Sequence, residues 1–304
     1  MDIENFTRLT DHTATSTDGW TNIGGIALES FSIVVDTTAR RNDGKVIRKK
    51  IEDFYGLPVK YLVLTHYHHD HISGRHAFKD LKIICSDSMP VNMDRIANAL
   101  TFKDLHTIED GNNSVRIIHT GGHTSGSSFV HFPRDKVVFA GDLVFENIFP
   151  PFGADLTCNP EKWIIALERI KAINPVKIVP GHGSIIDGHK IDNHVSNLEN
   201  IRQSIRNAIK ENIKPSEIEI TGYHGELHQR WLNGILTSWY PFYKVIDTIP
   251  ALIEELKANT RENSARILSK KTIKELEVIA KYLGKRIMGN KDEKIQIILD
   301  SVSA

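Results

Sequence analysis

The chain has 304 residues, its 38 Lys and Arg are balanced by 38 Asp and Glu, and 40% of it is hydrophobic. This length can bury the core of one large domain or two smaller ones, and the composition excludes disordered and collagen-like proteins. The zero net charge excludes a wholly basic nucleic-acid-binding protein. The unusual component is histidine: five of the 15 residues fall between His66 and His76.

Strand-like and helix-like patterns alternate through the first part of the chain. Short apolar runs rich in β-branched residues predict strands at residues 25–29, 31–36, 59–64, 82–85, 115–120, 127–132, 137–140 and 176–179. Apolar residues at helical spacing predict helices over residues 44–54 and 160–173, and the second helix has Pro160 in its first turn. This alternation predicts an α/β protein.

The pattern changes after Gly183. Residues 189–210 have the spacing of an amphipathic helix, no clear strand follows, and a two-helix pattern occurs at residues 272–283 and 292–302. We therefore expect a core domain over residues 1–190, a helical extension over residues 191–260 and a small helical tail over residues 261–304.

Cysteine and the N-terminus bear on the compartment. Cys85 and Cys158 lie far apart in no C-x-x-C pairing, which excludes a disulfide framework or a thiolate zinc site. The N-terminal Met1-Asp2-Ile3-Glu4 is acidic where a signal peptide is basic and then apolar. No stretch reaches the ~18 consecutive apolar residues that span a bilayer. We therefore expect a cytoplasmic protein with no membrane partner.

A histidine-rich motif follows the predicted strand at residues 59–64. It reads Thr65-His66-Tyr67-His68-His69-Asp70-His71. One interpretation is a solvated histidine-rich loop. The other is a metal site, because side chains at the carboxyl edge of a sheet can converge on one point.

Three later strand ends favour the metal site. They deliver His123 in Gly121-Gly122-His123-Thr124, Asp142 in Ala140-Gly141-Asp142, and His182 in Pro180-Gly181-His182-Gly183. Each follows an apolar strand and is flanked by glycine, which permits a sharp turn or a close backbone approach.

In this order, T-H-x-H-x-D-H, G-H-T, G-D and P-G-H-G resemble the motifs of the metallo-β-lactamase-fold hydrolase superfamily, over roughly the first 190 residues. The resemblance implies an αββα sandwich with metals in a shallow cleft at one sheet edge, followed here by a helical C-terminal extension. It implies that the first metal is held by His66, His68 and His123, the second by Asp70, His71 and His182, and that Asp142 bridges them. His69 occupies a variable position and is not expected to be a ligand. Asp142 speaks against the true β-lactamases and for a glyoxalase II-like or lactonase-like branch.

The residue types favour hydrolytic chemistry. A nitrogen-rich ligand set with carboxylates and no thiolate suits zinc, and it also accepts iron or manganese. We expect two divalent metal ions, with zinc preferred, that activate a water between them at neutral pH. The expected substrate is a small ester, thioester, lactone or related acyl compound. Asp70 is the expected catalytic residue, which orients the attacking hydroxide or accepts its proton.

Two other functions are kept as alternatives. The tail from residue 261 onward has ten Lys and Arg against six Asp and Glu and weakly resembles SAP-like or Rho-N-terminal-like modules, which often bind nucleic acid. A metal-dependent phosphodiesterase or nuclease with this tail as a clamp is therefore one alternative, although Tyr282 is nearly alone there as a stacking residue and a packed helical hairpin is slightly favoured. The other is a mononuclear iron enzyme resembling the persulfide dioxygenases, with His66, His123 and Asp142 around one iron. A homodimer is a further candidate state.

Weaker candidates surround these motifs. An apolar loop after Asp142 is a candidate lip over the metals, with packing in the core as the equal alternative; it contains Phe145, Phe149, Pro150, Pro151 and Phe152. His224 and His228 have helical spacing but no third ligand nearby, and Tyr223, His224 or Trp231 are candidates for substrate contact if the helical extension borders the cleft. The remaining histidines are expected to be structural or on the surface: His12, His76, His106, His119, His131, His189 and His194.

Overall fold

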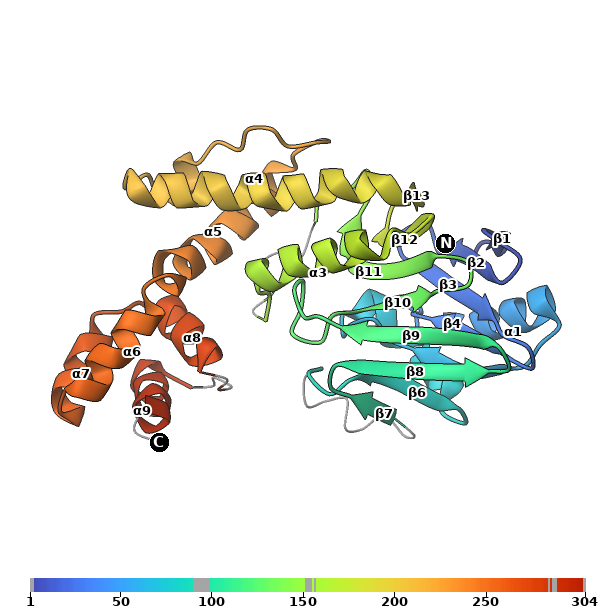
Figure 1. Ribbon diagram of the computed structural model, residues 1–304, viewed down its shortest axis with the longest axis horizontal. Helices are drawn as coiled ribbons and strands as arrows, with labels where there is room; N and C mark the ends of the chain where they lie inside the picture. Colours follow the sequence, from blue (N-terminus) through green and yellow to red (C-terminus); the bar gives the residue numbers. More distant parts are fainter. Residues whose placement is uncertain are drawn as a thin grey trace. The chain divides into compact units, whose positions relative to one another are not determined.

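The computed structural model describes residues 3–89, 99–150, 155, 157–283, 285 and 289–302 (Figure 1). The chain forms two compact units, one of Met1–Asn200 with Gly222–Trp231 and one of Ile201–Thr221 with Leu232–Ala304. The sequence predicted boundaries at residues 190 and 260, between a core domain, a helical extension and a tail. These boundaries stay a prediction. Among the described residues, no helix combines the length and the apolar character needed to cross a membrane.

The first unit contains a seven-stranded sheet in the order β1-β2-β3-β4-β5-β6-β7. The first four strands pair antiparallel and the last four pair parallel. Their bounds are Thr7–Arg8 (β1), Thr13–Thr17 (β2), Asn22–Ala27 (β3), Ser32–Val35 (β4), Val59–Val63 (β5), Lys82–Ser86 (β6) and Ala99–Phe102 (β7). The parallel arrangement of β4 and β5 brings their carboxyl ends to one edge.

A six-stranded sheet has the order β13-β12-β11-β10-β9-β8. Only β11 and β12 pair parallel among its described strands. The bounds are Leu105–Asp110 (β8), Asn113–His119 (β9), Ser128–Phe132 (β10), Val137–Phe145 (β11), Lys177–His182 (β12) and Ile186–Asp187 (β13). The carboxyl ends of β11 and β12 therefore also share an edge.

The two sheets pack face to face. Alternate side chains of both sheets fill the space between them, for example Ile33 and Val63 from one sheet and Val130 and Phe139 from the other. Helix α1 (Asp43–Tyr55) covers the outer face of the first sheet through Ile47 and Ile51. Helix α3 (Pro160–Ile173) covers the second, where the indole of Trp163 donates a hydrogen bond to the carbonyl of Leu143 at 2.9 Å. The layers are therefore helix, sheet, sheet and helix, which confirms the αββα architecture.

The remaining helices are α2 (His69–Ile72), α4 (Ile191–Lys210), α5 (Gln229–Ile246), α6 (Ile249–Ala258), α7 (Arg261–Ser269), α8 (Ile273–Tyr282) and α9 (Lys291–Val302). In the second unit, apolar side chains from α5 to α9 form one core that includes Val245, Leu268 and Ile298. Helix α8 begins with a capping box, in which Thr272 and Glu275 each bond the other's backbone N–H. The helices predicted at residues 272–283 and 292–302 correspond to α8 and α9.

Some elements differ from the sequence-based expectation. Strand β11 continues five residues past the predicted end at residue 140, across a register shift at Gly141, whose φ is 51°. Strand β2 was not predicted because its sequence, TATST, has no apolar alternation. Its hydroxyls are nevertheless buried, since they find backbone acceptors: Thr15 donates to the Ile23 carbonyl and Ser16 to the Glu4 carbonyl. Helix α5 lies in the segment expected to be a helical extension and continues through Pro241.

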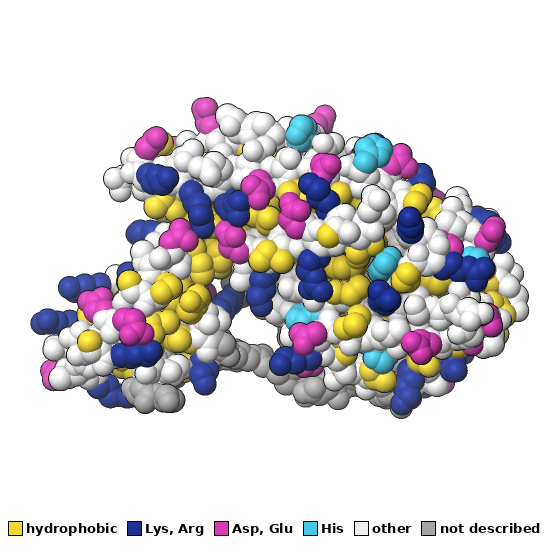
Figure 2. Space-filling model, in the orientation of Figure 1, with side chains coloured by type: hydrophobic (Ala, Val, Ile, Leu, Met, Phe, Trp, Pro, Cys, Tyr) yellow, Lys and Arg dark blue, Asp and Glu magenta, His cyan; other side chains and the backbone are white. Residues whose placement is uncertain are grey.

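Acidic and basic side chains are interspersed over the visible surface of the molecule (Figure 2), in keeping with the equal counts in the sequence.

Burial should make one of the two cysteines unreactive toward thiol reagents. Cys85 in β6 is completely buried, and this burial raises the pKa of its thiol to about 11. We expect native wild-type protein and a Cys85→Ala variant to release equal amounts of thionitrobenzoate from Ellman's reagent at pH 7.5. In guanidinium chloride the variant should release one equivalent less. A native wild-type protein that releases one equivalent more than the variant would contradict this burial.

Candidate metal centre

The centre lies where β4, β5, β11 and β12 end. Strand β5 delivers His66 and His68, α2 begins at His69 and carries Asp70 and His71, and β12 ends at His182. Asp142 lies within β11, and His123 lies in the turn between β9 and β10. The structure thus brings together all seven residues that the sequence proposed as metal ligands; their assignment as ligands stays a prediction.

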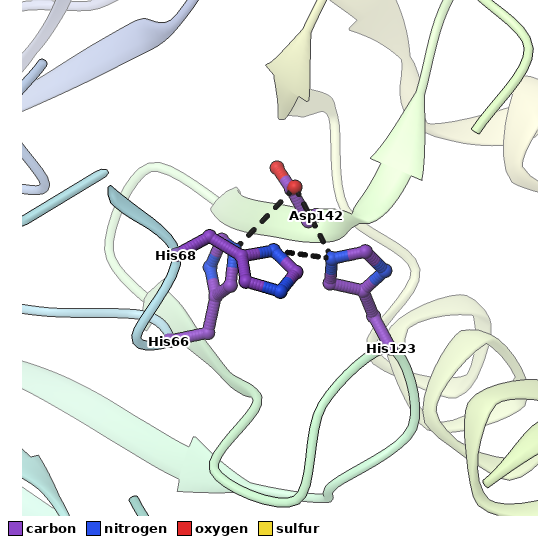
Figure 3. Close-up of side chains that lie close together, drawn as sticks. All are labelled: His66, His68, His123 and Asp142. Atoms are coloured by element: carbon purple, nitrogen blue, oxygen red, sulfur yellow. Dashed lines mark hydrogen bonds and ion pairs between the residues drawn. The ribbon is translucent and has the colours of Figure 1, made fainter. Parts of the chain in front are cut away.

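Four of these side chains form a first group, shown in Figure 3. The Nε2 atoms of His66 and His123 lie 3.4 and 3.3 Å from Asp142 Oδ2. Nδ1 of His68 lies 3.0 Å from His123 Nε2. One ligand atom from each residue therefore faces a common point.

Asp70, His71 and His182 form a second group. His182 Nε2 lies 3.3 Å from both His71 Nε2 and Asp70 Oδ2. Asp142 Oδ1 lies 3.0 Å from His71 Nε2 and 3.3 Å from His182 Nε2. The two oxygens of Asp142 therefore face different groups, Oδ2 the first and Oδ1 the second.

Hydrogen bonds on the far side of the imidazoles fix their orientation. His66 Nδ1 is 3.1 Å from the Thr65 hydroxyl, and His68 Nε2 is 3.2 Å from the Asp155 carboxylate. His182 Nδ1 donates to the carbonyl of Trp20 at 2.9 Å. A ring nitrogen that donates in this way leaves the other nitrogen as a lone-pair acceptor, which is the form that binds a metal.

Asp36 was missed by the sequence reading. It follows β4, is buried, and has a left-handed φ of 61°. Its carboxylate accepts hydrogen bonds from the Thr65 backbone at 2.7 Å, from the Thr65 hydroxyl at 2.6 Å and from His71 Nδ1 at 2.9 Å. It thereby holds the turn that carries the histidine motif. The one available signal was an acidic residue at the end of a predicted apolar strand.

Asp155 is a second residue that the sequence reading missed. Its carboxylate accepts a hydrogen bond from the Tyr67 hydroxyl at 2.7 Å, besides that from His68. Burial opposes its ionisation, but the hydrogen bonds from His68, Thr157 and Tyr67 hold its pKa below the usual range. It therefore remains a carboxylate that orients His68.

The centre surrounds one buried carboxylate with imidazole nitrogens. Both oxygens of Asp142 and Nε2 of His66 are buried and, among the described residues, have no hydrogen bond of acceptable geometry. Burial lowers the pKa of His66 and His123, so these rings are neutral. Burial likewise disfavours a charged His182, but Asp142 and Asp70 outweigh it and raise its pKa to about 9. Without a cation the buried Asp142 carboxylate is paired with His71 and His182, whose pKa values it raises, so divalent cations can take the place of these protons and the donor set fits them.

The weaker candidates fall into different environments. The ring of Phe145 lies 5.7 Å from that of His123 and 5.4 Å from that of His182, so it borders both groups. Phe149 is buried and packs 5.4 Å from Tyr223, whereas Pro151 and Phe152 lie outside the described residues. Within the described part of the chain, His69, His224 and His228 belong to no group of potential metal ligands.

His194 was expected to be structural or on the surface. It is partly buried, and its Nε2 lies 3.2 Å from the Glu146 carboxylate. Together with Pro150, Asn197 and Tyr223 it lines a small cavity of about 20 Å³, which has room for about one water molecule.

Replacing Asp36 with Asn tests its positioning of His71. The amide keeps the size of the side chain, but it removes the charge and one of the acceptors that Thr65 and His71 use. We expect the affinity of the second group for Zn²⁺ to fall by about 10–100-fold, the range typical of partners that orient metal ligands. Metal titration against a chromophoric chelator measures this, with exposed Asp187→Asn as the control. Equal affinities in the two variants would contradict the assigned role.

Comparisons with known proteins agree with this geometry. A model of the Metallo-beta-lactamase superfamily matches residues 21–182. The chain is 23% identical over 171 residues to a "Beta-lactamase-like protein 2 homolog" of Caenorhabditis elegans, a match that covers 54% of this chain and 56% of that protein. It is 26% identical over 193 residues to a hydroxyacylglutathione hydrolase of Brucella ovis, which covers 62% of this chain and 70% of that protein. The matched region thus spans little more than half the length of the C. elegans relative.

A solved structure of a metallo-beta-lactamase from Pontibacter korlensis superposes with a TM-score of 0.59 at 20% identity. It covers 66% of this chain and 100% of that chain, so the shared part is the two-sheet fold.

Proposed function

Because the chain belongs to the metallo-beta-lactamase superfamily, we propose that it is a metal-dependent hydrolase with a binuclear centre, acting on a small acyl compound. The substrate class is an ester, thioester or lactone, and the relative named hydroxyacylglutathione hydrolase supports a thioester in particular. The observation that carries the binuclear centre is the division of Asp142, whose two oxygens face two separate groups of ligand atoms.

The first group would hold one ion through Nε2 of His66, Nδ1 of His68 and Nε2 of His123. The second would hold the other through Asp70 Oδ2 and the Nε2 atoms of His71 and His182. When bound, such a pair of ions lowers the pKa of a water molecule toward ~7 and stabilises negative charge that develops on the substrate. We propose zinc for both positions, because imidazole nitrogens dominate the donor set.

Asp70 is the more exposed of the two carboxylates in the proposed ligand set. Its side chain is 14% exposed, compared with 1% for Asp142. Burial opposes its ionisation, but His182 and His71 hold its pKa below the usual range. We propose that Asp70 orients the attacking water or accepts its proton, while the buried Asp142 keeps the two groups together.

Metal content and substrate scope together test the proposal. We expect elemental analysis of the purified protein to give two zinc ions per chain, and turnover of a hydroxyacylglutathione or a lactone to disappear on chelation and return with Zn²⁺. One iron per chain, with oxygen consumption on a glutathione persulfide, would instead indicate the mononuclear oxygenase. Turnover of a phosphodiester alone would contradict the acyl substrate class.

Within residues 261–283, 285 and 289–302, the described part of the tail, no feature specifically supports a nucleic-acid clamp. The described helices α7, α8 and α9 bury apolar sides in a shared core. Two cations of this segment are paired with acids: Arg261 with Asp300 at 2.5 Å and Lys294 with Glu277 at 3.3 Å. An acyl hydrolase is therefore the function that the site supports best.

A further inference from the structure

A tryptophan outside the ligand set reaches the second group. Trp20 lies in the turn between β2 and β3, and its side chain was not singled out by any sequence motif. Its indole Nε1 donates a hydrogen bond to Asp70 Oδ2 at 3.2 Å. The centre of its ring lies 4.9 Å from that of His182, and the planes are inclined by 51°. Both contacts are thus with members of the second group.

The backbone around Trp20 is fixed to the strand that carries His182. The Trp20 carbonyl accepts the hydrogen bond from His182 Nδ1, and Thr21 forms a β-bridge with His182. The amide of Asn22 donates to the carbonyls of Pro180 and Gly183 at 3.0 and 2.8 Å. The turn is therefore tied to β12 by four contacts of its backbone and of the Asn22 side chain.

The turn itself is internally braced. The Asp18 carboxylate accepts from the backbone N–H groups of Trp20 and Thr21 at 3.0 and 2.8 Å. Gly19 has a left-handed φ of 88°. This geometry directs the indole toward Asp70 although the Trp20 residue is 42% exposed.

The position of the hydrogen bond determines its effect. An indole N–H is a donor only, so it can bind the carboxylate but cannot replace it as a metal ligand. It contacts Oδ2, the same oxygen that lies 3.3 Å from His182 Nε2. The side chain of Asp70 is 14% exposed, whereas that of Asp142, the other carboxylate of the centre, is 1% exposed. The orientation of Asp70 therefore depends more than that of Asp142 on a hydrogen bond from a residue outside the ligand set.

We propose that Trp20 is a positioning residue of the second group: its indole N–H holds Asp70 in the orientation that completes this group and sets the affinity for the second ion. The indole contacts Asp70 and His182 and no ligand of the first group, so its loss leaves the intrinsic affinity of the first group for its ion unchanged. This inference rests on the proposed binuclear centre.

Titration of metal-free protein with Zn²⁺ against a chromophoric chelator tests the inference. In Trp20→Phe the ring stays beside His182 but the donor is lost, and we expect the second binding step to weaken by about 10-fold. The first step should match the wild type. In Trp20→Ala, which also removes the ring, the second step should weaken at least as much. Trp231→Phe, which removes an indole that packs against His228, is the control and should leave both steps unchanged.

Activity provides a readout that a general structural defect would not give. We expect the hydrolysis rate of Trp20→Phe to rise with added Zn²⁺ in parallel with the occupancy of the second binding step, whereas a general structural defect would not respond to Zn²⁺ in this way. An unchanged second step in Trp20→Phe, or equal weakening of both steps, would overturn the inference while leaving the proposed function intact. A wild-type protein that binds a single ion would overturn the binuclear proposal and this inference with it.

Discussion

Replacing Asp142 with Asn is expected to lower kcat/KM for acyl hydrolysis by at least about 100-fold, the upper end of the effect of substituting residues that merely orient ligands. The reason is that Asp142 reaches both groups, with Oδ2 toward His66 and His123 and Oδ1 toward His71 and His182. Asn has the same shape, but it lacks the charge and places an N–H₂ donor against one pair of imidazoles. Both metal-binding steps should therefore weaken.

Steady-state kinetics on a hydroxyacylglutathione and elemental analysis measure this effect, and Asp187→Asn on the exposed part of β13 serves as the control. Loss of a single ion, with the other retained at wild-type affinity, would show that Asp142 belongs to one group. Wild-type activity in Asp142→Asn would reject the centre altogether.

The second large effect is expected from Gly181→Ala. A Cβ atom at Gly181 would lie 2.0 Å from Asp142 Oδ1 and 2.8 Å from the carbonyl carbon of Gly141. Since neighbouring backbone cannot yield easily, the Asp142 carboxylate must move. We expect kcat/KM to fall by about 100-fold, as for a catalytic group misplaced by ~1 Å. The free energy of unfolding should fall by about 1–3 kcal/mol through overpacking.

Gly56→Ala is a matched control for this substitution. Gly56 ends α1 with a left-handed φ of 65°, and a Cβ there would meet no atom within 4 Å. The control should cost about 1–2 kcal/mol of stability through backbone strain but leave activity and metal content unchanged. If both glycine variants lost activity to the same extent, the effect would be one of stability and not of the position of Asp142.

The inner strands and the ligand motifs could be predicted because local sequence encodes them. Strands such as β5 and β10 are short apolar runs buried along most of their length, which a single sequence reveals. Glycines beside His123, Asp142 and His182 mark the turns and close approaches that bring these residues to the sheet edges. The order of the motifs then supplied a resemblance that no single segment carries, and the family match supports it.

The supporting residues could not be predicted because their roles exist only in three dimensions. Asp155 lies 87 positions from His68, and Trp20 lies 50 positions from Asp70. Nothing in the local sequence of either residue indicates that the fold brings it to a histidine or an aspartate. The contact of His194 is of the same kind: its helical position gives no sign of the Glu146 carboxylate that it meets just after β11.

The split orientation of Asp142 also has a thermodynamic consequence. Because one carboxylate would serve two cations, the free energies of binding them cannot be independent. The presence of one ion must change the affinity for the other, and reciprocity requires that the factor be the same in both directions. The half-loaded protein is then a distinct species whose abundance depends on the sign of this coupling. When metal is scarce, the fraction of chains that hold two ions would therefore not change in proportion to the metal concentration.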